Sequence, residues 1–291
     1  METAELIKKV RRLQILSSHL VSETLAGNYV SAFRGSGMEF DKVREYQVGD
    51  DVRNIDWNVT ARSGTPHIKS FIEEREMTVM LMVDGSSSVA FGSGTQNKME
   101  LASEMSAVLA FSAIANGDKV GLIIFTEEIE IYLPPAKGRD HVLRVIRELL
   151  SFKPQKAETN LKGALEFLSK VQKRRSVSFL VSDFLDEDFN NQLSTASNRH
   201  DLIAVRIGDQ REKKLPNLGL IRLEDAETSK QIVIDTASAK GRAQLQARAD
   251  KLETELDSLF KQRKIDSVNV VTNEDYLLPL KMLFKKREKK R

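Results

Sequence analysis

The sequence predicts an α/β fold, a doubly wound and mainly parallel sheet. Short continuous apolar runs alternate with longer segments whose apolar residues recur at spacings of three and four. The short runs are typical of strands buried on both faces, and the longer segments are typical of helices that cover a sheet. Alternation of this kind imposes right-handed crossovers between parallel strands.

Each element follows from a local pattern. Buried strands are expected at 79–83, 119–125, 176–181 and 202–207, an alternating edge strand at 129–133, and a final strand at 267–271. Helices are expected at 98–116, 138–151, 161–173, 186–199, 243–260 and 277–284. A polar turn between residues 220–223 and 231–234 predicts a hairpin before the long helix at 243–260.

Two segments of different character precede this alternation. Residues 3–26 carry an apolar stripe at helical spacing, whereas glycines punctuate residues 27–76 and indicate irregular, partly β structure. The predicted organisation is a helical segment (1–34), an irregular segment (35–76), an α/β domain (77–274) with a hairpin insertion near 219–235, and a terminal helix with a basic tail (275–291).

Composition limits the classes of function. The chain has 291 residues, no cysteine and a formal net charge of +3. Without cysteine, disulfides, thiolate metal sites and cysteine nucleophiles are excluded. We see no apolar run long enough for a membrane span and no signal-peptide core, so we expect a cytoplasmic protein. We interpret the basic segment 285–291 as a solvated tail, with peripheral contact to an anionic membrane as the alternative.

The candidate functional site is the turn after the first buried strand. Asp84, Ser86 and Ser88 place oxygen-bearing side chains just past the strand's carboxyl end, where open α/β sheets bind ligands. Thr159 precedes a predicted helix and Asp183 follows another buried strand, so both can lie at the same edge. Two carboxylates and three hydroxyls are ligands for a hard cation, which favours Mg²⁺ or Mn²⁺.

These five residues resemble the metal-ion-dependent adhesion site of von Willebrand factor A domains. In that family the serines and the threonine approach the metal, and the aspartates act directly or through water. One coordination position stays open for an acidic side chain of a partner. The resemblance therefore implies a protein-binding domain in which Mg²⁺ accepts an Asp or Glu from another protein.

Motifs before the first buried strand resemble bacterial domain-of-unknown-function 58 proteins. They include Gly35-Ser36-Gly37, Arg44-Glu45-Tyr46, Ile55-Asp56-Trp57 and Glu73-Glu74-Arg75. This resemblance implies an adaptor that works with a MoxR-type AAA+ ATPase in the assembly or maturation of protein complexes.

The same segment holds candidates for a partner-docking surface, namely Arg53, Asp56, Trp57 and Arg62. The alternative interpretation is a structural charge network, in which bidentate arginine–carboxylate pairs and a buried Trp57 fix the irregular segment.

Enzyme functions have weaker support. A Mg²⁺-dependent phosphatase would use Asp84 as its nucleophile, but it usually needs a carboxylate where Ser86 stands and a lysine, and no lysine has a compelling placement. Motifs for serine hydrolysis and ATP binding are absent from the sequence, and its few aromatic residues do not indicate nucleic-acid binding. We expect a protein without enzymatic activity; a scaffold with a vestigial metal site is the other alternative.

Overall fold

The computed structural model describes residues 10–11, 29, 32, 37–74, 76–186, 188–213, 216–224 and 231–289. The chain divides into two compact units, Arg34–Met77 and the rest of the chain. The helix expected at 3–26 lies outside the described residues, apart from Val10 and Arg11, which are helical.

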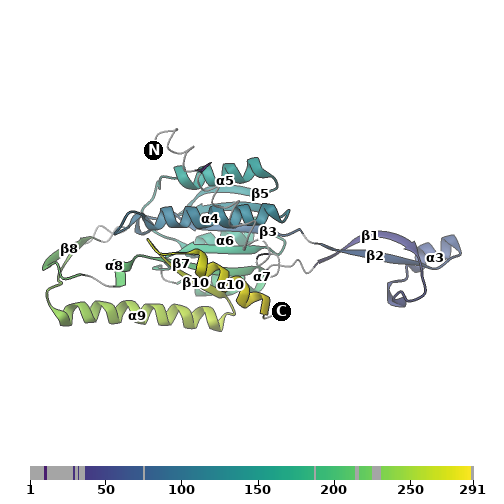
Figure 1. Cartoon of the computed structure of the whole chain (residues 1–291). Coiled ribbons are helices and arrows are strands. Elements are labelled where there is room, and N and C mark those ends of the chain that lie inside the picture. Colours follow the sequence, from purple (N-terminus) through teal and green to yellow (C-terminus); the bar gives the residue numbers. More distant parts are fainter. Residues whose placement is uncertain are drawn as a thin grey trace. The chain divides into compact units, whose positions relative to one another are not determined.

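The larger unit is built on a six-stranded sheet (Figure 1) with the order β10-β7-β6-β3-β4-β5. Its strands are β3 (Thr78–Asp84), β4 (Lys119–Phe125), β5 (Ile129–Ala136), β6 (Val177–Ser182), β7 (Asp201–Gly208) and β10 (Asp266–Val271). Strand β5 pairs antiparallel with β4 at one edge, and all the other neighbours are parallel. The predicted doubly wound, mainly parallel sheet is confirmed.

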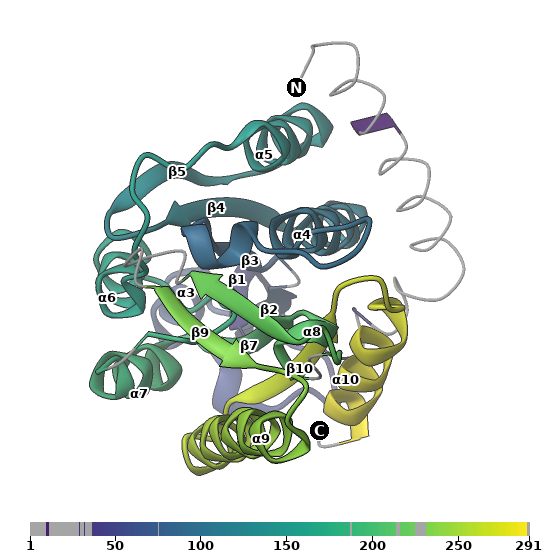
Figure 2. The ribbon, with the colours of Figure 1, turned by 90° about the vertical axis from the view of Figure 1, so that its left-hand side faces the viewer.

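Helices cover both faces of this sheet (Figure 2). On one face lie α4 (Lys98–Ala115), α5 (Arg139–Ser151) and α10 (Leu277–Lys289). On the other lie α6 (Leu161–Val171), α7 (Asn190–Arg199) and α9 (Ala239–Gln262). The remaining elements of this unit are η3 (Ser87–Ala90), α8 (Gln210–Lys213) and the hairpin of β8 (Leu220–Glu224) and β9 (Gln231–Asp235).

The central strand β3 contributes to both halves of the core. Because side chains alternate along a strand, Met80 and Met82 pack with the residues of α6, α7 and α9. Val79, Leu81 and Val83 are equally buried and face the side covered by α4. This explains why the strand has a continuous apolar run: neither of its faces meets water.

The basic C-terminal segment differs from the solvated tail that the sequence predicts. Helix α10 continues to Lys289, and Arg287 within it is buried. The Arg287 guanidinium donates to Asp266 at 2.9 Å and also pairs with Asp201, which joins α10 to β10 and β7. Across the described ranges, every helix is too short or too polar to span a lipid bilayer.

Replacing Arg287 with methionine is expected to lower the free energy of unfolding by about 3 kcal/mol, because two partly buried carboxylates lose their cation. Lys286→Met is the matched control, since Lys286 is exposed one position earlier in the same helix. Urea unfolding of the two variants measures the difference. Equal stabilities would show that the Arg287 ion pairs contribute nothing.

The smaller unit is an antiparallel hairpin of β1 (Gly37–Glu45) and β2 (His67–Glu74), more regular than the sequence predicts. The connection between these strands holds η2 (Val52–Asn54) and α3 (Trp57–Ser63). Asp56 begins α3 by accepting hydrogen bonds from the backbone N–H groups of Asn58 and Val59. Of the side chains described in this unit, Ile68 alone is buried.

Candidate metal site

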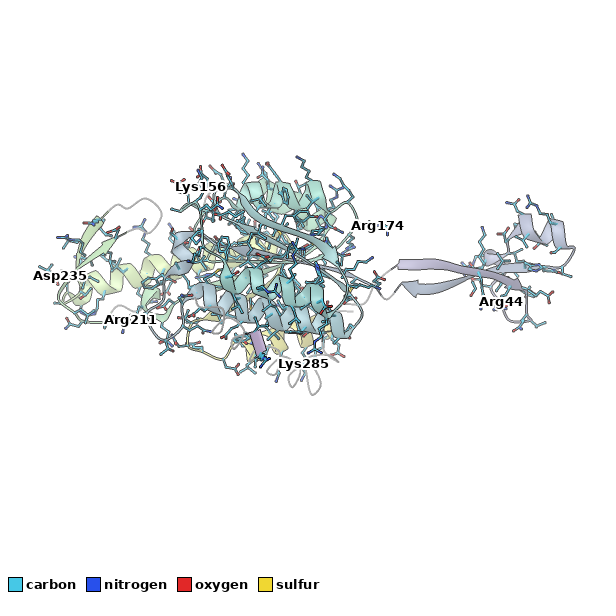
Figure 3. All side chains as sticks on the ribbon, turned by 90° about the horizontal axis from the view of Figure 1, so that it is seen from above. Arg44, Lys156, Arg174, Arg211, Asp235 and Lys285 are labelled. Carbon is cyan, nitrogen blue, oxygen red and sulfur yellow. The ribbon has the colours of Figure 1, made fainter. Side chains whose placement is uncertain are left out.

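The candidate site lies at the topological switch point of the sheet. From β3 the chain proceeds to β4 and β5 on one side, and then β6 pairs with the opposite side of β3. Asp84 ends β3 and Asp183 directly follows β6, so both lie at the carboxyl edge where such sheets bind ligands. Figure 3 labels Arg211 at this end of the larger unit and Arg174, which precedes β6, at the other end.

Asp84 is a fully buried carboxylate that accepts hydrogen bonds from Ser182 and Ser86. The hydroxyl of Ser182 donates to its Oδ2 at 2.6 Å, and the backbone N–H of Ser86 donates to its Oδ1 at 3.0 Å. Burial, together with the charge of Asp183, raises the pKa of Asp84 to about 7. The chain's own donors therefore compensate the Asp84 charge only in part, and a divalent cation at this point would stabilise the ionised form.

The hydroxyl residues lie on loops that meet at this edge. Ser86 Oγ and Ser88 Oγ are 3.0 Å apart, so both project to the same side of the turn. A Cβ atom on Gly85 would lie 2.3 Å from the ring of Phe152, and this close approach requires glycine. The loop that carries Thr159 is joined to the turn by a hydrogen bond from Ser87 N to the Ala157 carbonyl at 2.9 Å.

The chain bends sharply after Asp183. Phe184 has a φ of 58°, in the left-handed region that is unfavourable for a non-glycine residue. Its buried ring packs against Phe189 and Phe260, and its N–H donates to the hydroxyl of Ser182 at 3.0 Å. Strain of this kind persists where surrounding packing fixes it, and here it turns the backbone beside the carboxylate.

A buried lysine reaches the site as well. Lys98 begins α4, and its ammonium donates to Asp183 Oδ2 at 2.8 Å and to Glu212 Oε1 at 2.7 Å. Burial lowers the pKa of Lys98, but its two carboxylate partners outweigh burial, so the net pKa is raised and the ammonium is charged. The sequence identifies no lysine for this site, whereas the structure places the Lys98 ammonium in contact with Asp183. Nothing in the local sequence signals a contact between residues 85 positions apart.

Asp209 fastens the loop that follows the turn. Its buried carboxylate accepts hydrogen bonds from Ser93 N and Arg211 N, both at 2.9 Å, and from the hydroxyls of Ser93 and Thr272, both at 2.5 Å. Although burial raises the pKa of Asp209, these donors outweigh it and hold the pKa at about 2. Asp209 is thus saturated with donors, in contrast to Asp84.

The donor set suits a hard divalent cation. In the part of the chain that the structure describes, no three acidic or histidine side chains gather into a metal-binding group. A metal at this edge would therefore rely on two carboxylates, hydroxyls and water. This is the kind of environment in which Mg²⁺ keeps part of its hydration shell, and Mn²⁺ shares its preference for oxygen.

A cavity of about 860 Å³ opens beside Asp183. It is bounded by β7, α8 and α9. Its lining combines apolar residues with two arginines and four carboxylates, namely Arg206, Arg211, Asp183, Asp209, Glu212 and Glu274.

The candidate docking residues lie in the smaller unit. Trp57 is 70% exposed, and Val48 and Val52 are also exposed, so the alternative with a buried Trp57 is wrong. Ion pairs nevertheless exist: Arg53 pairs with Asp51 at 2.7 Å, while Asp56 caps α3 and lies 3.7 Å from Lys69. The fourth candidate, Arg62, is exposed in the last turn of α3.

Comparison with known proteins identifies relatives of the chain. The family described as "Protein of unknown function DUF58" matches residues 42–255. An uncharacterized protein of Mycobacterium tuberculosis is 31% identical over 257 residues, which cover 86% of this chain and 81% of that protein.

Two solved structures also match the chain, at lower identity. An aerotolerance-related membrane protein from Bacteroides fragilis is 16% identical with a TM-score of 0.49, covering 74% of this chain and 100% of that one. The SpRpn10 von Willebrand factor A domain is 11% identical with a TM-score of 0.40, covering 72% and 94%. Since the family match spans most of the sequence, the chain belongs to the DUF58 family.

Proposed function

We propose that this chain is a metal-dependent protein-binding adaptor. Mg²⁺, or Mn²⁺, is held by Asp84, Ser86, Ser88, Thr159 and Asp183, and it takes an Asp or Glu of a partner protein as a further ligand. The observation that carries the proposal is a fully buried Asp84 with a raised pKa beside Asp183 and beside two hydroxyls 3.0 Å apart.

The closeness of the Asp84 and Asp183 carboxylates supports binding through a metal. When bound, the divalent cation supplies the positive charge that lets two neighbouring carboxylates ionise together and attracts a third from outside. Ser182 and the backbone of Ser86 orient Asp84, and Lys98 orients Asp183. Each carboxylate is therefore held in place before the metal arrives, which limits the ordering cost of capture.

Binding without catalysis fits the burial of these groups. The Asp84 carboxylate is fully buried and held by hydrogen bonds from Ser182 and Ser86, as suits a fixed metal ligand. The Lys98 ammonium is enclosed by Asp183 and Glu212, so it is not free to balance a phosphate. A Mg²⁺-dependent turnover of an aryl phosphate that is lost in Asp84→Asn would favour the phosphatase alternative instead.

We assign the exposed surface of Trp57, Val48 and Val52 to a second interaction, with the AAA+ ATPase. All three side chains are exposed, and tryptophan is enriched among the residues that contribute most to protein-binding surfaces. The resemblance to domain-of-unknown-function 58 proteins implies that this ATPase is of the MoxR type. A scaffold whose metal site is vestigial would use this surface alone.

Trp57→Ala is expected to weaken binding to the ATPase by about 30-fold with or without Mg²⁺, because an exposed tryptophan is a frequent hot spot of interfaces. Thermal unfolding of the variant should match the wild type, since Trp57 makes little contact with its own unit. Ile68→Ala, at the buried residue of the same unit, is the contrasting control and should destabilise it. Unchanged ATPase affinity in Trp57→Ala would refute the docking surface.

The experiment that tests the proposed function is affinity capture from a lysate of the source cell, in parallel with Mg²⁺ and with EDTA. We expect a protein that is retained with Mg²⁺, released by EDTA, and recovered when Mg²⁺ is restored. A partner that is held equally well in EDTA would contradict the metal-dependent mechanism and shift the interaction to the Trp57 surface.

A further inference from the structure

We propose that Lys98 is a built-in counter-cation that lowers the Mg²⁺ affinity of the site, so that stable metal capture requires the carboxylate of a partner. This inference rests on the proposed function, because it concerns the same metal site. It adds a residue that sets the site's affinity.

The position of Lys98 is unusual for a lysine. Its side chain is 1% exposed, and lysine is almost never buried to this degree unless it is paired. It also stands at the first position of α4, whose start is fixed by the capping box of Asn97 and Glu100. A cation is unfavourable at the amino end of a helix, because the helix dipole is positive there. The ammonium is therefore held by its acidic partners, not by the helix.

Those partners connect Lys98 to the metal site. Asp183, which is itself 4% exposed at its side chain, is both the nearest acceptor on one side and a proposed metal ligand. Glu212 on the other side is 36% exposed and holds the ammonium from the direction of α8. One carboxylate is thus shared between a fixed internal cation and the incoming Mg²⁺.

Charge balance gives the direction of the effect. With Asp84, Asp183 and Glu212 ionised, Lys98 leaves the cluster at a net charge of −2, which Mg²⁺ neutralises. Without Lys98 the net charge would be −3, and the attraction for a divalent cation would be greater. Because Lys98, Asp84 and Asp183 are buried, water screens the repulsion between Lys98 and Mg²⁺ only weakly. The carboxylate of a partner adds one negative charge, which offsets the positive charge of Lys98 and restores the affinity for Mg²⁺.

The test is a calorimetric titration of Mg²⁺ into the full chain and into two variants. Lys98→Met keeps the length of the side chain and removes its charge, and we expect Mg²⁺ to bind at least about tenfold more tightly. Glu212→Gln removes an opposing charge at a partly exposed position, and we expect affinity to fall by about threefold. A purely structural ion pair would shift both affinities in the same direction.

Folded Lys98→Met with unchanged or weaker Mg²⁺ affinity would overturn the inference and leave Lys98 as a positioning residue for Asp183. Should Lys98→Met fail to fold, Glu212→Gln decides, and equal or tighter binding in that variant overturns the inference. If the wild type binds Mg²⁺ but the variants do not follow the expected order of affinity, the inference about Lys98 fails and the proposed function stands. If neither the wild type nor either variant binds Mg²⁺, the proposed function fails with it.

Discussion

Asp84→Asn should abolish Mg²⁺-dependent partner capture and at the same time stabilise the metal-free chain above neutral pH. The amide removes a charged metal ligand, and we expect the affinity for the partner to fall by more than about 100-fold. It keeps the size of the side chain, and its oxygen can still accept from Ser86 N while its NH₂ group donates to the Ser182 hydroxyl.

The gain in stability follows from the pKa of Asp84, which is about 7 in the folded chain against 3.8 in a model peptide. A raised carboxyl pKa means that ionisation opposes folding: the cost is absent below pH 4, grows as pH rises, and is complete above pH 7. Asparagine lacks this cost, so it should raise the free energy of unfolding at pH 8 by up to about 4 kcal/mol.

Urea unfolding in EDTA at pH 4 and pH 8 measures the difference in stability between variant and wild type. Partner capture with Mg²⁺ measures the loss of affinity. We expect nearly equal stabilities of variant and wild type at the lower pH and a more stable variant at the higher one. An Asp84→Asn chain that still captures the partner would exclude Asp84 as a ligand. A variant that is less stable at pH 8 would show that the buried carboxylate is already compensated.

Asp209→Ala is expected to lower the free energy of unfolding by about 2–4 kcal/mol, because four donors from Ser93, Arg211 and Thr272 lose their acceptor. The pKa of Asp209, about 2, is depressed. Its contribution is therefore complete above the unfolded pKa near 4 and is lost as pH falls through 2. Stability of the wild type should fall across this acidic range more steeply than that of the variant.

Asp257→Ala, on the exposed face of α9, is the matched control and should change stability by less than about 0.5 kcal/mol. Because Ser93 lies on the loop that follows Ser86 and Ser88, Asp209→Ala should also weaken Mg²⁺ binding. Equal unfolding free energies of the two variants would mean that Asp209 does not fasten this loop.

The strands of the sheet can be predicted from local sequence, because buried parallel strands need continuous apolar runs. The run at Val79–Val83 and the one at 176–181 both end within one residue of the end of a strand. Placing Asp84 and Asp183 at one edge then follows from the topology, because parallel strands point the same way. This much of the candidate site can be predicted without coordinates.

Contacts made across the sequence could not be predicted in this way. Lys98 occupies a helical position, and nothing near it shows that its ammonium meets Glu212, 114 residues away. Trp57 has a large and mostly apolar side chain that is expected in a core, yet its unit is too small to enclose it. Arg287 belongs to a basic run whose charge predicts exposure to solvent. The structure instead buries it and pairs it with Asp201 and Asp266.

The most direct measurement of the central claim is an anomalous difference map from crystals of the full chain grown with saturating Mn²⁺, which accepts the same oxygen ligands as Mg²⁺, and with acetate in place of the partner's carboxylate. We predict a peak at about 2.1 Å from the hydroxyls of Ser86 and Ser88, with Asp84 and Asp183 beside it and Thr159 facing it. A map without a peak at this edge, or with its peak at another carboxylate cluster, would contradict the account.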